Sequence, residues 1–398
     1  MEFKETAMRN WLLGQFTNRI ENAGGLGYAL SHYPILLSQY YPLMKYKILI
    51  LSSEQFGYLT DTLKYCEYAA NDFEITYVGW DYNRPKIELP GINVKYVSRK
   101  SNLLVRNFRL LKAFHKEIKS GYHLVFATYT RGISIVKFFN HHAKFIVDVR
   151  SLCVNPKKLK RIVYDYFLKF EISIFKDVSV ISEGVASKLK LKNYHLLPIG
   201  GECFTADSKS FEKLSYLYVG TLQNRNILEC VKGFHLYLMD FGNKSSAPVF
   251  TIVGDSPGNE LQEIRGYIQA NCLSDNIITA GAVPQNKLRP YFESANVGVS
   301  YIPLRSYFKY QPPTKTFEYL ISGLPVIATS TYENINVVTE NVGILIEDNA
   351  QSVFAGLKKL DEQRTKFNSN IIRRSHAQFT WEEVVKKEFT LLIERLIK

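Results

Sequence analysis

The stretch of sequence that decides the fold is YQPPTKTFEYLISGLPVIA, residues 310–328. Two prolines precede a segment of helical periodicity, a glycine ends it, and the apolar run 325–328 follows, which predicts a loop, a helix and a buried strand. The first N–H groups of that helix, on Thr314 and Lys315, have no acceptor within the helix and suit a phosphate. Glu318 lies one turn further, where its carboxylate can reach a ribose diol beside that phosphate. Alternatively, Glu318 only favours the helix dipole.

Strands and helices alternate on both sides of this stretch. Runs of strand length are mostly separated by helical segments, which is the signature of a parallel α/β sheet. The pattern begins at residue 46 and begins again at residue 215. The predicted strands are 46–51, 74–78, 92–97, 123–127, 144–149 and 178–181 in the first set, and 215–220, 249–253, 276–279, 297–301, 325–328 and 344–346 in the second.

The repeated pattern predicts two α/β domains of similar size, each Rossmann-like, with a cleft between them. Open α/β sheets bind ligands at the carboxyl ends of their strands, so two facing sheets would enclose one site. A polar segment at 206–213 is the best linker. The predicted parts are an extension or helical cap of uncertain status (1–43), a first domain (44–208), a second domain (209–378) and an amphipathic C-terminal helix (379–398).

The composition is that of an ordinary globular protein, because 46% of the 398 residues are hydrophobic and 22% are charged. No apolar run approaches the roughly 18–20 residues that a membrane span needs. The acidic residues near the start do not fit a signal peptide. The five cysteines are scattered and form no C-x-x-C pair, so neither a disulfide framework nor a structural zinc site is expected. These features predict a cytoplasmic protein that holds no metal.

The formal net charge of +13 is concentrated in one half of the chain. Residues 1–205 contain 29 Lys and Arg against 17 Asp and Glu, whereas residues 206–398 contain 21 against 20. A basic amphipathic helix is predicted within 99–119, and the second basic run 157–161 favours a shared surface. Such a surface suits an anionic membrane or a phosphorylated acceptor, although the basic face could also be merely solvated. The cations of the predicted helix are Arg106, Arg109, Lys112, Lys116 and Lys119.

Several common site motifs are missing from the sequence. No G-x-G-x-x-G follows a strand and there is no Walker loop, which argues against dinucleotide chemistry and P-loop hydrolysis. No Asp-x-Asp is present to hold a metal–diphosphate. The neighbouring His141 and His142 would point apart, which argues against a metal pair. A nucleic-acid partner is suggested by the basic charge alone and is not expected, because no recognition motif accompanies that charge.

The pattern Pro-x-Lys-x-x-Glu-Tyr-Leu-x-x-Gly-x-Pro-Val-Ile-Ala at 313–328 resembles the donor motif of glycosyltransferase family 4, which has the GT-B fold. The resemblance extends from about residue 44 to the C-terminus and is closer in the second half than in the first. Other segments that resemble the family are 180–183 and 197–200 in the first half, and 218–227, 250–255, 278–284 and 342–344 in the second.

The resemblance implies a retaining, metal-independent transfer of a sugar from a nucleotide-diphosphate sugar, of UDP or GDP type. It places positive charge from Arg225 and Lys315 on the leaving diphosphate, Glu318 on the ribose, and the backbone of Val283 beside the base. No separate cofactor is implied. The donor-binding residues that it implies are Gly57, Gly220, Arg225, Gly254, Val283, Thr314, Lys315 and Glu318.

On the acceptor side, Asp148 and Arg150 stand at the end of a predicted strand and resemble the family's acceptor landmark. They are expected near the acceptor hydroxyl, although Asp148 could instead cap the next turn. The catalytic set that the resemblance implies is Asp148, Arg150, Arg225, Lys315 and Glu318. The GT-B fold also implies that the last helix crosses back onto the first domain. The alternative is a free helical tail for a partner.

Two departures from the family pattern bear on the donor site. The family often has a second Glu eight positions before the ribose-binding one, and here that position is Tyr310. The loop after the first strand is usually Gly-Gly, whereas here it runs from Ser52 to Gly57 and Gly57 is its only glycine. The contact to the sugar and the contact of the first-domain loop to the donor are therefore open.

The preferred hypothesis is a glycosyltransferase that is peripheral on the inner face of the plasma membrane and extends a glycan or lipid-diphosphate-linked acceptor. Bacterial capsule, O-antigen or exopolysaccharide biosynthesis is typical of the family. Transfer to a soluble or protein acceptor is a second hypothesis. A third is a catalytically weak GT-B protein that only binds a nucleotide sugar or a partner.

Overall fold

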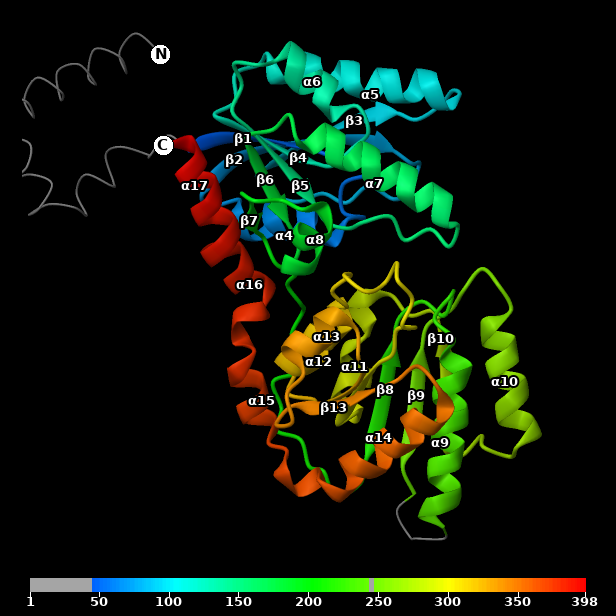
Figure 1. Cartoon of the computed structure of the whole chain (residues 1–398). Helices are drawn as coiled ribbons and strands as arrows, with labels where there is room; N and C mark the ends of the chain where they lie inside the picture. The colour runs from blue at the N-terminus through cyan, green and yellow to red at the C-terminus, as the bar shows by residue number, and fades with distance from the viewer. Residues whose placement is uncertain (1–44, 243–246) are drawn as a thin grey trace, which may run out of the picture. The chain divides into compact units, whose positions relative to one another are not determined.

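The computed structural model describes residues 45–242 and 247–398. The predicted extension 1–43 lies outside the described residues, so its status stays a prediction. Two parallel sheets with alternating helices make up the described part (Figure 1), which confirms the α/β class and the two Rossmann-like domains. The boundaries between the domains stay predictions. Within the described residues, no helix combines the length and apolarity that crossing a bilayer requires.

Seven parallel strands form the sheet of the first domain. They are β1 Tyr46–Leu51, β2 Phe73–Asp81, β3 Ile92–Ser98, β4 Leu124–Thr128, β5 Phe145–Val149, β6 Asp177–Val180 and β7 His195–Leu196. Their order in the sheet is β3-β2-β1-β4-β5-β6-β7. The strands β4 and β5 are buried along their whole length, as expected of parallel strands covered on both faces. Pairing of Leu51 with Ala127, and of Thr128 with Asp148, brings the carboxyl ends of the strands to one edge.

The helices of the first domain are α4 Thr60–Ala69, α5 Leu103–Ile118, α6 Ile133–Phe139, α7 Lys158–Ile172 and α8 Glu183–Leu189. The crossovers through α5, α6 and α7 all run in the same direction across the sheet. Because such crossovers are right-handed, these three helices lie on one face. The crossover through α4 runs in the opposite direction and places α4 on the other face. Figure 1 shows α5, α6 and α7 together, and α6 contacts both neighbours.

Six parallel strands form the sheet of the second domain, in the order β10-β9-β8-β11-β12-β13. The strands are β8 Ser215–Val219, β9 Val249–Val253, β10 Ile277–Gly281, β11 Val297–Ser300, β12 Val326–Thr329 and β13 Gly343–Ile346. The helices are α9 Ile227–Phe241, α10 Glu260–Ala270, α11 Arg289–Ser294, α12 Thr314–Ile321, α13 Tyr332–Val337, α14 Ala350–Glu362 and α15 Ser369–Ser375. The decisive stretch 310–328 is therefore a loop, α12 and β12, as predicted.

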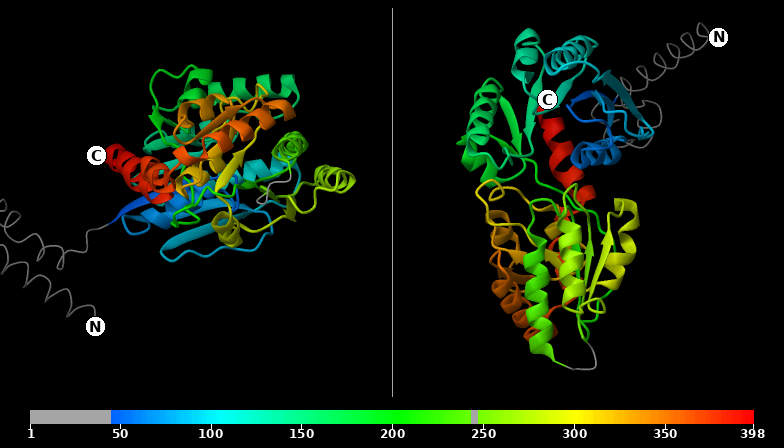
Figure 2. Two further views of the ribbon diagram at one scale, coloured as in Figure 1. Left: turned by 90° about the horizontal axis from the view of Figure 1, so that it is seen from below. Right: turned by 90° about the vertical axis from the view of Figure 1, so that its right-hand side faces the viewer.

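The C-terminal helix returns from the second domain to the first, as the GT-B resemblance implies. It runs through α16 Trp381–Val384, the π-helical turn η4 Val385–Thr390 and α17 Leu391–Ile397. Trp381 and Phe389 belong to the core of the first domain, and the Phe389 ring stacks on Tyr65 with centroids 4.5 Å apart. Figure 2 shows the last turns beside the first domain. The alternative of a free tail is wrong.

Helix α5 forms where a basic amphipathic helix is predicted, but its faces differ from the prediction. Only Leu110, Phe114 and Ile118 are buried, because the first turns extend past the sheet and leave Leu104 and Phe108 exposed by 81% and 68%. Two of its five predicted surface cations are occupied within the domain. The Arg109 guanidinium donates to the carbonyl oxygens of Ser98 and Lys100, and Arg106 lies 5.9 Å from the Trp80 ring. Lys112, Lys116 and Lys119 are exposed, as predicted.

Candidate functional site

A cavity of about 570 Å³ lies where the carboxyl ends of the second sheet face the start of α4. The ends of β8 and β9, the loop after β10 and the first turn of α12 form one side. The segment from Tyr58 to Asp61, together with Ile199 and Trp381, forms the other. Pockets for small molecules are typically about 300–1,000 Å³, and open α/β sheets bind ligands at this end of the strands. The cavity is therefore the candidate site.

The floor of the cavity is backbone rather than side chain. A Cβ atom on Gly254 would lie 1.9 Å from the carbonyl oxygen of Gly220, so position 254 accepts no side chain. The Gly254 N–H donates to the Gly281 carbonyl at 2.8 Å, and the Gly220 N–H donates to the Val253 carbonyl at 3.0 Å. These bonds fix the adjacent strand ends. A ligand can approach such a floor more closely than it could approach side chains.

The N-terminus of α12 opens on the same cavity through Thr314 and Lys315. Pro313 precedes the helix, and no side chain caps it, so the first-turn N–H groups of α12 are available to a ligand. The helix is anchored from behind by Thr316, whose hydroxyl hydrogen-bonds Ser300 Oγ at 2.6 Å and Asn334 Oδ1 at 2.9 Å. An anion in the cavity would meet N–H donors and the positive end of the helix dipole.

Glu318 is the buried carboxylate of the cavity wall, with only 2% of its surface exposed. Burial raises the pKa of Glu318, and the neighbouring Lys315 ammonium opposes that rise. Lys315 Nζ donates directly to Glu318 Oε2. The pair holds a positive and a negative group at one point of the cavity, where a ligand with a phosphate and a diol could engage both.

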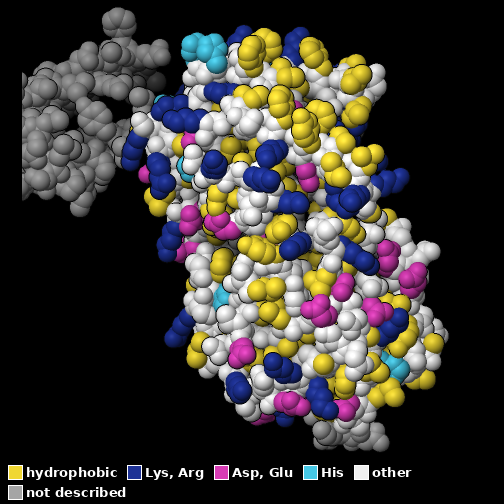
Figure 3. Space-filling model, in the orientation of Figure 1, with side chains coloured by type: hydrophobic (Ala, Val, Ile, Leu, Met, Phe, Trp, Pro, Cys, Tyr) yellow, Lys and Arg dark blue, Asp and Glu magenta, His cyan; other side chains and the backbone are white. Residues whose placement is uncertain are grey.

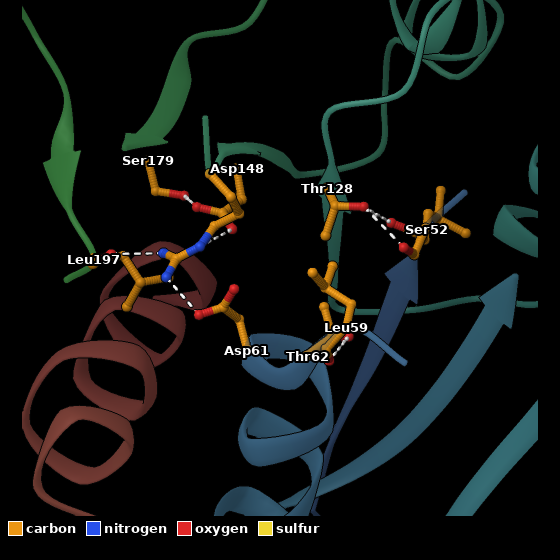
Figure 4. Close-up of polar contacts among 10 residues, drawn as sticks. Ser52, Leu59, Asp61, Thr62, Thr128, Asp148, Ser179 and Leu197 are labelled. Atoms are coloured by element: carbon orange, nitrogen blue, oxygen red, sulfur yellow. Dashed lines mark hydrogen bonds and ion pairs between the residues drawn. The ribbon is translucent and has the colours of Figure 1, made fainter. Parts of the chain in front are cut away.

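On the first-domain side, Asp61 in the first turn of α4 brings a second carboxylate to the cavity. Arg150 holds it in place: one Nη donates to Asp61 Oδ1 at 2.7 Å and the other donates to the Leu197 carbonyl at 2.7 Å. Figure 4 shows Asp61 and Asp148 as separate carboxylates, one on α4 and one at the end of β5. Asp61 therefore has a fixed position at the cavity, backed by a buried guanidinium.

Comparison with known proteins agrees with this architecture. Residues 213–362 match the family model "Glycosyl transferases group 1". The structure is similar to sucrose-phosphate synthase from Thermosynechococcus elongatus, with a TM-score of 0.65 and 17% identity over 88% of this chain and 99% of that one. It is also similar to Anabaena HepE in complex with UDP and glucose, with a TM-score of 0.63 and 13% identity over 88% and 100% of the two chains.

A third similar structure is the lipopolysaccharide outer core galactosyltransferase WaaB, with a TM-score of 0.62 and 12% identity over 88% of this chain and 99% of that one. A search of curated proteins found no match. The chain has the GT-B fold, and the match to the glycosyl transferases group 1 model lies within its second domain. The resemblance inferred from the sequence is thus confirmed at this level, while assignment to family 4 in particular stays a prediction.

The GT-B cavity brings together most of the donor-binding residues that the sequence predicts. Those that line it are Gly220, Gly254, Val283, Thr314, Lys315 and Glu318. Their distribution over the ends of β8 and β9, the loop after β10 and the start of α12 follows from the strand order, which places β8, β9 and β10 side by side. Their individual roles stay predictions.

Two predicted donor residues, Gly57 and Arg225, do not line the cavity. Gly57 has a φ of +88° and packs against Ile87, where a Cβ would lie 2.3 Å from Ile87 Cδ1. The loop before it is closed by Gln55, whose side chain bonds the backbone of Tyr82 and Arg84. Gly57 thus serves the turn itself, and its approach to the donor stays a prediction.

The Arg225 guanidinium lies over the Phe308 ring, 4.3 Å from its centroid. One of its Nη atoms is buried and has no hydrogen-bond partner. Burial lowers the pKa of Arg225 from its ordinary value, because no carboxylate compensates the loss of water. The side chain therefore stands outside the cavity with an unused donor.

The predicted acceptor residues Asp148 and Arg150 lie behind the cavity wall rather than in it. Asp148 is 1% exposed, and its Oδ1 accepts from the Ser179 hydroxyl at 2.7 Å. Burial raises the pKa of Asp148 to about 6, although Arg150, whose Nε is 3.8 Å from Asp148 Oδ2, opposes the rise. Both residues stand behind Asp61 in this structure, and their contact with an acceptor hydroxyl stays a prediction.

Asp61 and Trp381 are two of the cavity residues that sequence reasoning missed; Tyr58, Leu59, Thr60 and Gln285 are others. A signal for Asp61 is present in the sequence, since it is an acidic residue in the first turn of the helix that follows the first strand. Parallel strands place such residues at the ligand-binding edge. Trp381 carries no local signal, because it enters the cavity only through the return of the C-terminal helix.

Tyr310, which stands where the family often has a Glu, is a packing residue. Its ring lies 5.3 Å from that of Tyr332, and a Cβ on Gly184 would come within 2.7 Å of Tyr310 Cδ1. It lines a separate cavity of about 220 Å³ beside α7. Within the described residues, no three His, Cys, Asp or Glu side chains are grouped as potential metal ligands. Metal independence stays a prediction.

Proposed function

We propose that the chain is a retaining, metal-independent glycosyltransferase that moves a sugar from a nucleotide-diphosphate sugar, of UDP or GDP type, to a glycan or lipid-linked acceptor. Bacterial capsule, O-antigen or exopolysaccharide biosynthesis is the proposed context, on the inner face of the plasma membrane. The observation that carries the proposal is the convergence of bare backbone, a helix N-terminus and the Lys315–Glu318 pair on one cavity.

The donor occupies the cavity with its diphosphate at the N-terminus of α12. The N–H groups of Thr314 and Lys315 and the Lys315 ammonium then neutralise the diphosphate. Glu318 turns from Lys315 to the ribose diol, and the base lies along the loop at Val283. After this exchange Glu318 is bound to the ribose diol and Lys315 to the diphosphate. Each charged group therefore keeps a partner in the buried site, as a buried charge requires.

Transfer breaks the bond between the anomeric carbon and the diphosphate oxygen, and the diphosphate leaves with the electron pair. The acceptor hydroxyl forms the new bond on the same face, and its proton passes to the leaving oxygen. No protein nucleophile takes part. Lys315 and the α12 N–H groups stabilise the charge that develops on the leaving group, which is where preorganised donors have the largest effect.

Arg225 supplies further charge in this proposal. Its free Nη donor is oriented by stacking on Phe308, and its position before α9 allows it to turn toward the diphosphate. On the acceptor side, Asp61 orients the hydroxyl, while Arg150 and Asp148 keep Asp61 in position. The similarity to a structure that contains UDP and glucose supports the choice of donor class.

The test is a thermal-shift panel of UDP, GDP, ADP, CDP and CMP on the wild type, on Glu318→Gln and on Glu333→Gln. A ligand at about 100 times its Kd stabilises a protein by about 2.7 kcal/mol, which is a shift of a few degrees. One diphosphate should shift the wild type and the control Glu333→Gln, a buried carboxylate that accepts from the Ser182 hydroxyl away from the cavity. An equal shift in Glu318→Gln would refute the proposed donor site.

A catalytically weak GT-B protein that only binds a nucleotide sugar or a partner is the second candidate. Two observations favour it: Tyr310 replaces a frequent Glu, and Lys315 and Glu318 already satisfy each other. Radiolabelled donor, in the presence of membrane extract from the source organism, separates the two candidates. Binding without hydrolysis or transfer would support the second.

A further inference from the structure

The three helices α5, α6 and α7 expose an unusual amount of apolar surface. Of the 26 large apolar side chains that are exposed in the described residues, 13 lie on these helices. Leu104, Phe108, Phe138, Phe139 and Tyr166 are each at least 64% exposed. Figure 3 shows hydrophobic side chains gathered where Figure 1 places these helices. We call the outward faces of the three helices the α5–α7 surface.

The α5–α7 surface is continuous, because the helices are joined side by side. His115 on α5 bonds Asn140 at the end of α6 at 2.9 Å, and its ring lies 6.2 Å from Phe139. Glu171 on α7 accepts from the Gly132 N–H, which begins α6, at 2.9 Å. Contiguous apolar patches of more than a few hundred Å² on a soluble domain mark an interaction site. The exposed side chains therefore belong to one site.

The net positive charge of the same helices favours a negatively charged binding partner. Nine Lys and Arg lie on α5, α6 and α7 against three acidic residues. The acidic residues are all engaged within the domain: Glu117 pairs with Lys95 at 2.7 Å, Asp165 accepts from the Cys153 N–H at 3.1 Å, and Glu171 accepts from Gly132. Lys137 donates to the carbonyl oxygens of His141 and Ala143. The exposed lysines that can act on an external partner include Lys112, Lys116, Lys158 and Lys160.

The mixture of lysines with aromatic and aliphatic side chains fits a lipid bilayer better than a protein partner. Lysine is depleted in protein–protein interfaces. At a bilayer surface, by contrast, apolar side chains enter the boundary between headgroups and acyl chains while lysines extend to lipid phosphates. The alternation of the two kinds of side chain on the exposed face of α7, Lys158 to Phe170, follows this pattern.

We propose that the α5–α7 surface inserts into the headgroup region of an anionic bilayer and that apolar insertion, more than basic charge, holds the protein there. The proposal deepens the proposed function, on which its biological purpose rests, by naming the side chains that meet the membrane. It also extends the expectation from sequence that the basic face of α5, together with the basic run 157–161, makes the contact, since Arg106 and Arg109 are occupied within the domain.

The position of α7 connects this surface with the cleft. Its first turn lines the cavity of about 220 Å³ with Lys158 and Arg161, and Lys188 on α8 lies opposite. A bilayer on the α5–α7 surface would bring lipid phosphates to these cations. A lipid-linked diphosphate could then pass from the membrane along α7 to this cavity, where the cations would meet its phosphates.

The experiment is sedimentation of the full chain with vesicles of phosphatidylcholine, with and without phosphatidylglycerol. The test variant is the double substitution Phe138→Ser and Phe139→Ser, at side chains that are 72% and 64% exposed. The matched control is Met239→Ser with Ile371→Ser, on the second domain at 69% and 63% exposure. Partition onto anionic vesicles should fall at least tenfold in the test variant and stay unchanged in the control.

Salt separates insertion from purely electrostatic attachment. At about 1 M salt the Debye length is about 3 Å, so a contact made by charge alone disappears. Measurable binding of the wild type should persist there, and the triple variant Lys112→Ala, Lys116→Ala, Lys119→Ala should weaken binding only at low salt. Unchanged binding in the phenylalanine variant, or complete loss of wild-type binding in salt, overturns the proposal.

A second copy of the chain is the competing occupant. If the wild type sediments as a dimer without lipid and the phenylalanine variant as a monomer, the surface is a dimer interface and the proposal is wrong. Failure here is distinguishable from failure of the proposed function. A chain that responds to UDP or GDP but ignores vesicles refutes only the insertion, whereas vesicle binding without a nucleotide response refutes only the donor site.

Discussion

The helices that cover the two sheets share one plan but present different side chains to solvent. Helices α9, α10 and α14 of the second domain expose only two large apolar side chains, Leu236 and Met239, both on α9. Helices α5, α6 and α7 of the first domain expose 13. Packing a helix on a sheet needs one apolar stripe, so the second domain shows what the fold requires. The first domain carries apolar surface beyond that requirement.

The difference matches the two proposals, which give each domain its own way of recognising a ligand. In the proposed function the second domain recognises its ligand inside a cavity, with strand-end glycines at its floor and the Lys315–Glu318 ion pair in its wall. The outer helices of this domain expose few large apolar side chains, and residues 206–398 are nearly neutral in charge. The first domain contributes fewer groups to the cavity and instead presents a broad apolar and basic exterior. A small ligand needs concave, preorganised groups, whereas an extended surface needs many exposed ones.

The largest effect is expected where the two regions are physically tied together. Trp381→Ala should lower the free energy of unfolding by about 3–5 kcal/mol, because it empties a buried indole site between α4 and Gly200, which lies in the segment after β7. Urea unfolding measures the change. Leu391→Ala, at a half-exposed position on the same helix, is the control and should cost far less. Equal losses of stability in the two variants would mean that the C-terminal helix does not belong to the hydrophobic core of the first domain.

The next effect tests whether recognition by the second domain is independent of the first. Lys315→Ala should reduce kcat by about 100- to 1,000-fold, the range for losing one preorganised donor at a developing negative charge. Binding to anionic vesicles should not change. Transfer is followed with labelled donor, and Lys359→Ala on the exposed face of α14 is the charge-matched control. A parallel loss of vesicle binding would contradict the separation of the two regions.

The buried carboxylate behind the cavity predicts a pH dependence of stability. Burial raises the pKa of Asp148 from 3.8 in the unfolded chain to about 6 in the folded one. The folded state therefore binds the proton more tightly, and this contribution to stability is lost as pH rises from about 4 through 6. The loss is at most about 3 kcal/mol.

Urea unfolding between pH 4 and pH 7 measures this loss. Asp148→Asn keeps the shape and the hydrogen bond from Ser179 while removing the titration, so its stability should change less over the same range. Ser330→Ala, at a half-buried hydroxyl in the second domain, controls for the substitution itself. An identical pH profile in wild type and Asp148→Asn would show that Asp148 keeps an ordinary pKa.

The smallest effect concerns the cavity beside α7, through which an acceptor would pass from the α5–α7 surface toward the donor cavity. Lys188→Ala should raise KM for a lipid-diphosphate acceptor about fivefold, equivalent to about 1 kcal/mol per cation near an anionic surface, and leave KM for the donor unchanged. Lys190→Asn removes the same charge two residues further on, at the left-handed C-cap of α8, a conformation that Asn tolerates, and is the control. An equal rise of the acceptor KM in both variants would indicate general electrostatic attraction of the acceptor rather than binding in the cavity beside α7.

Most of the fold could be predicted because its signals are local. Predicted strands such as 46–51 and 249–253 coincide with β1 and β9 to the residue, since alternation and length are visible in a short window. The stretch 310–328 likewise contains its own helix start, helix stop and strand. The extent of α5's buried face was not predictable in this way. Periodicity defines an apolar arc, but only contact with the sheet decides which part of the arc is covered.

The site was predictable for the second domain and less so for the first. Six predicted donor residues that lie on adjacent strand ends and on α12 line one cavity, while their roles stay predictions. On the first-domain side, the sequence pointed to Asp148, but Asp61 is the carboxylate that lines the cavity. The direction of a side chain at a strand end depends on its neighbours, and here Ser179 and Arg150 keep Asp148 directed inward. Arg225 stands outside the cavity because the Phe308 ring holds its guanidinium.

The sequence by itself determined the alternation of elements, the GT-B resemblance and the convergence of donor residues, because each depends on spacing within a few turns or on the strand order that α/β crossovers impose. Tertiary structure alone decided which carboxylate of the first domain lines the cavity and that Trp381 lines it too. It also decided how many apolar side chains α5, α6 and α7 expose. These features join segments far apart in the chain. Burial and exposure are properties of the whole fold, and no local pattern contains them.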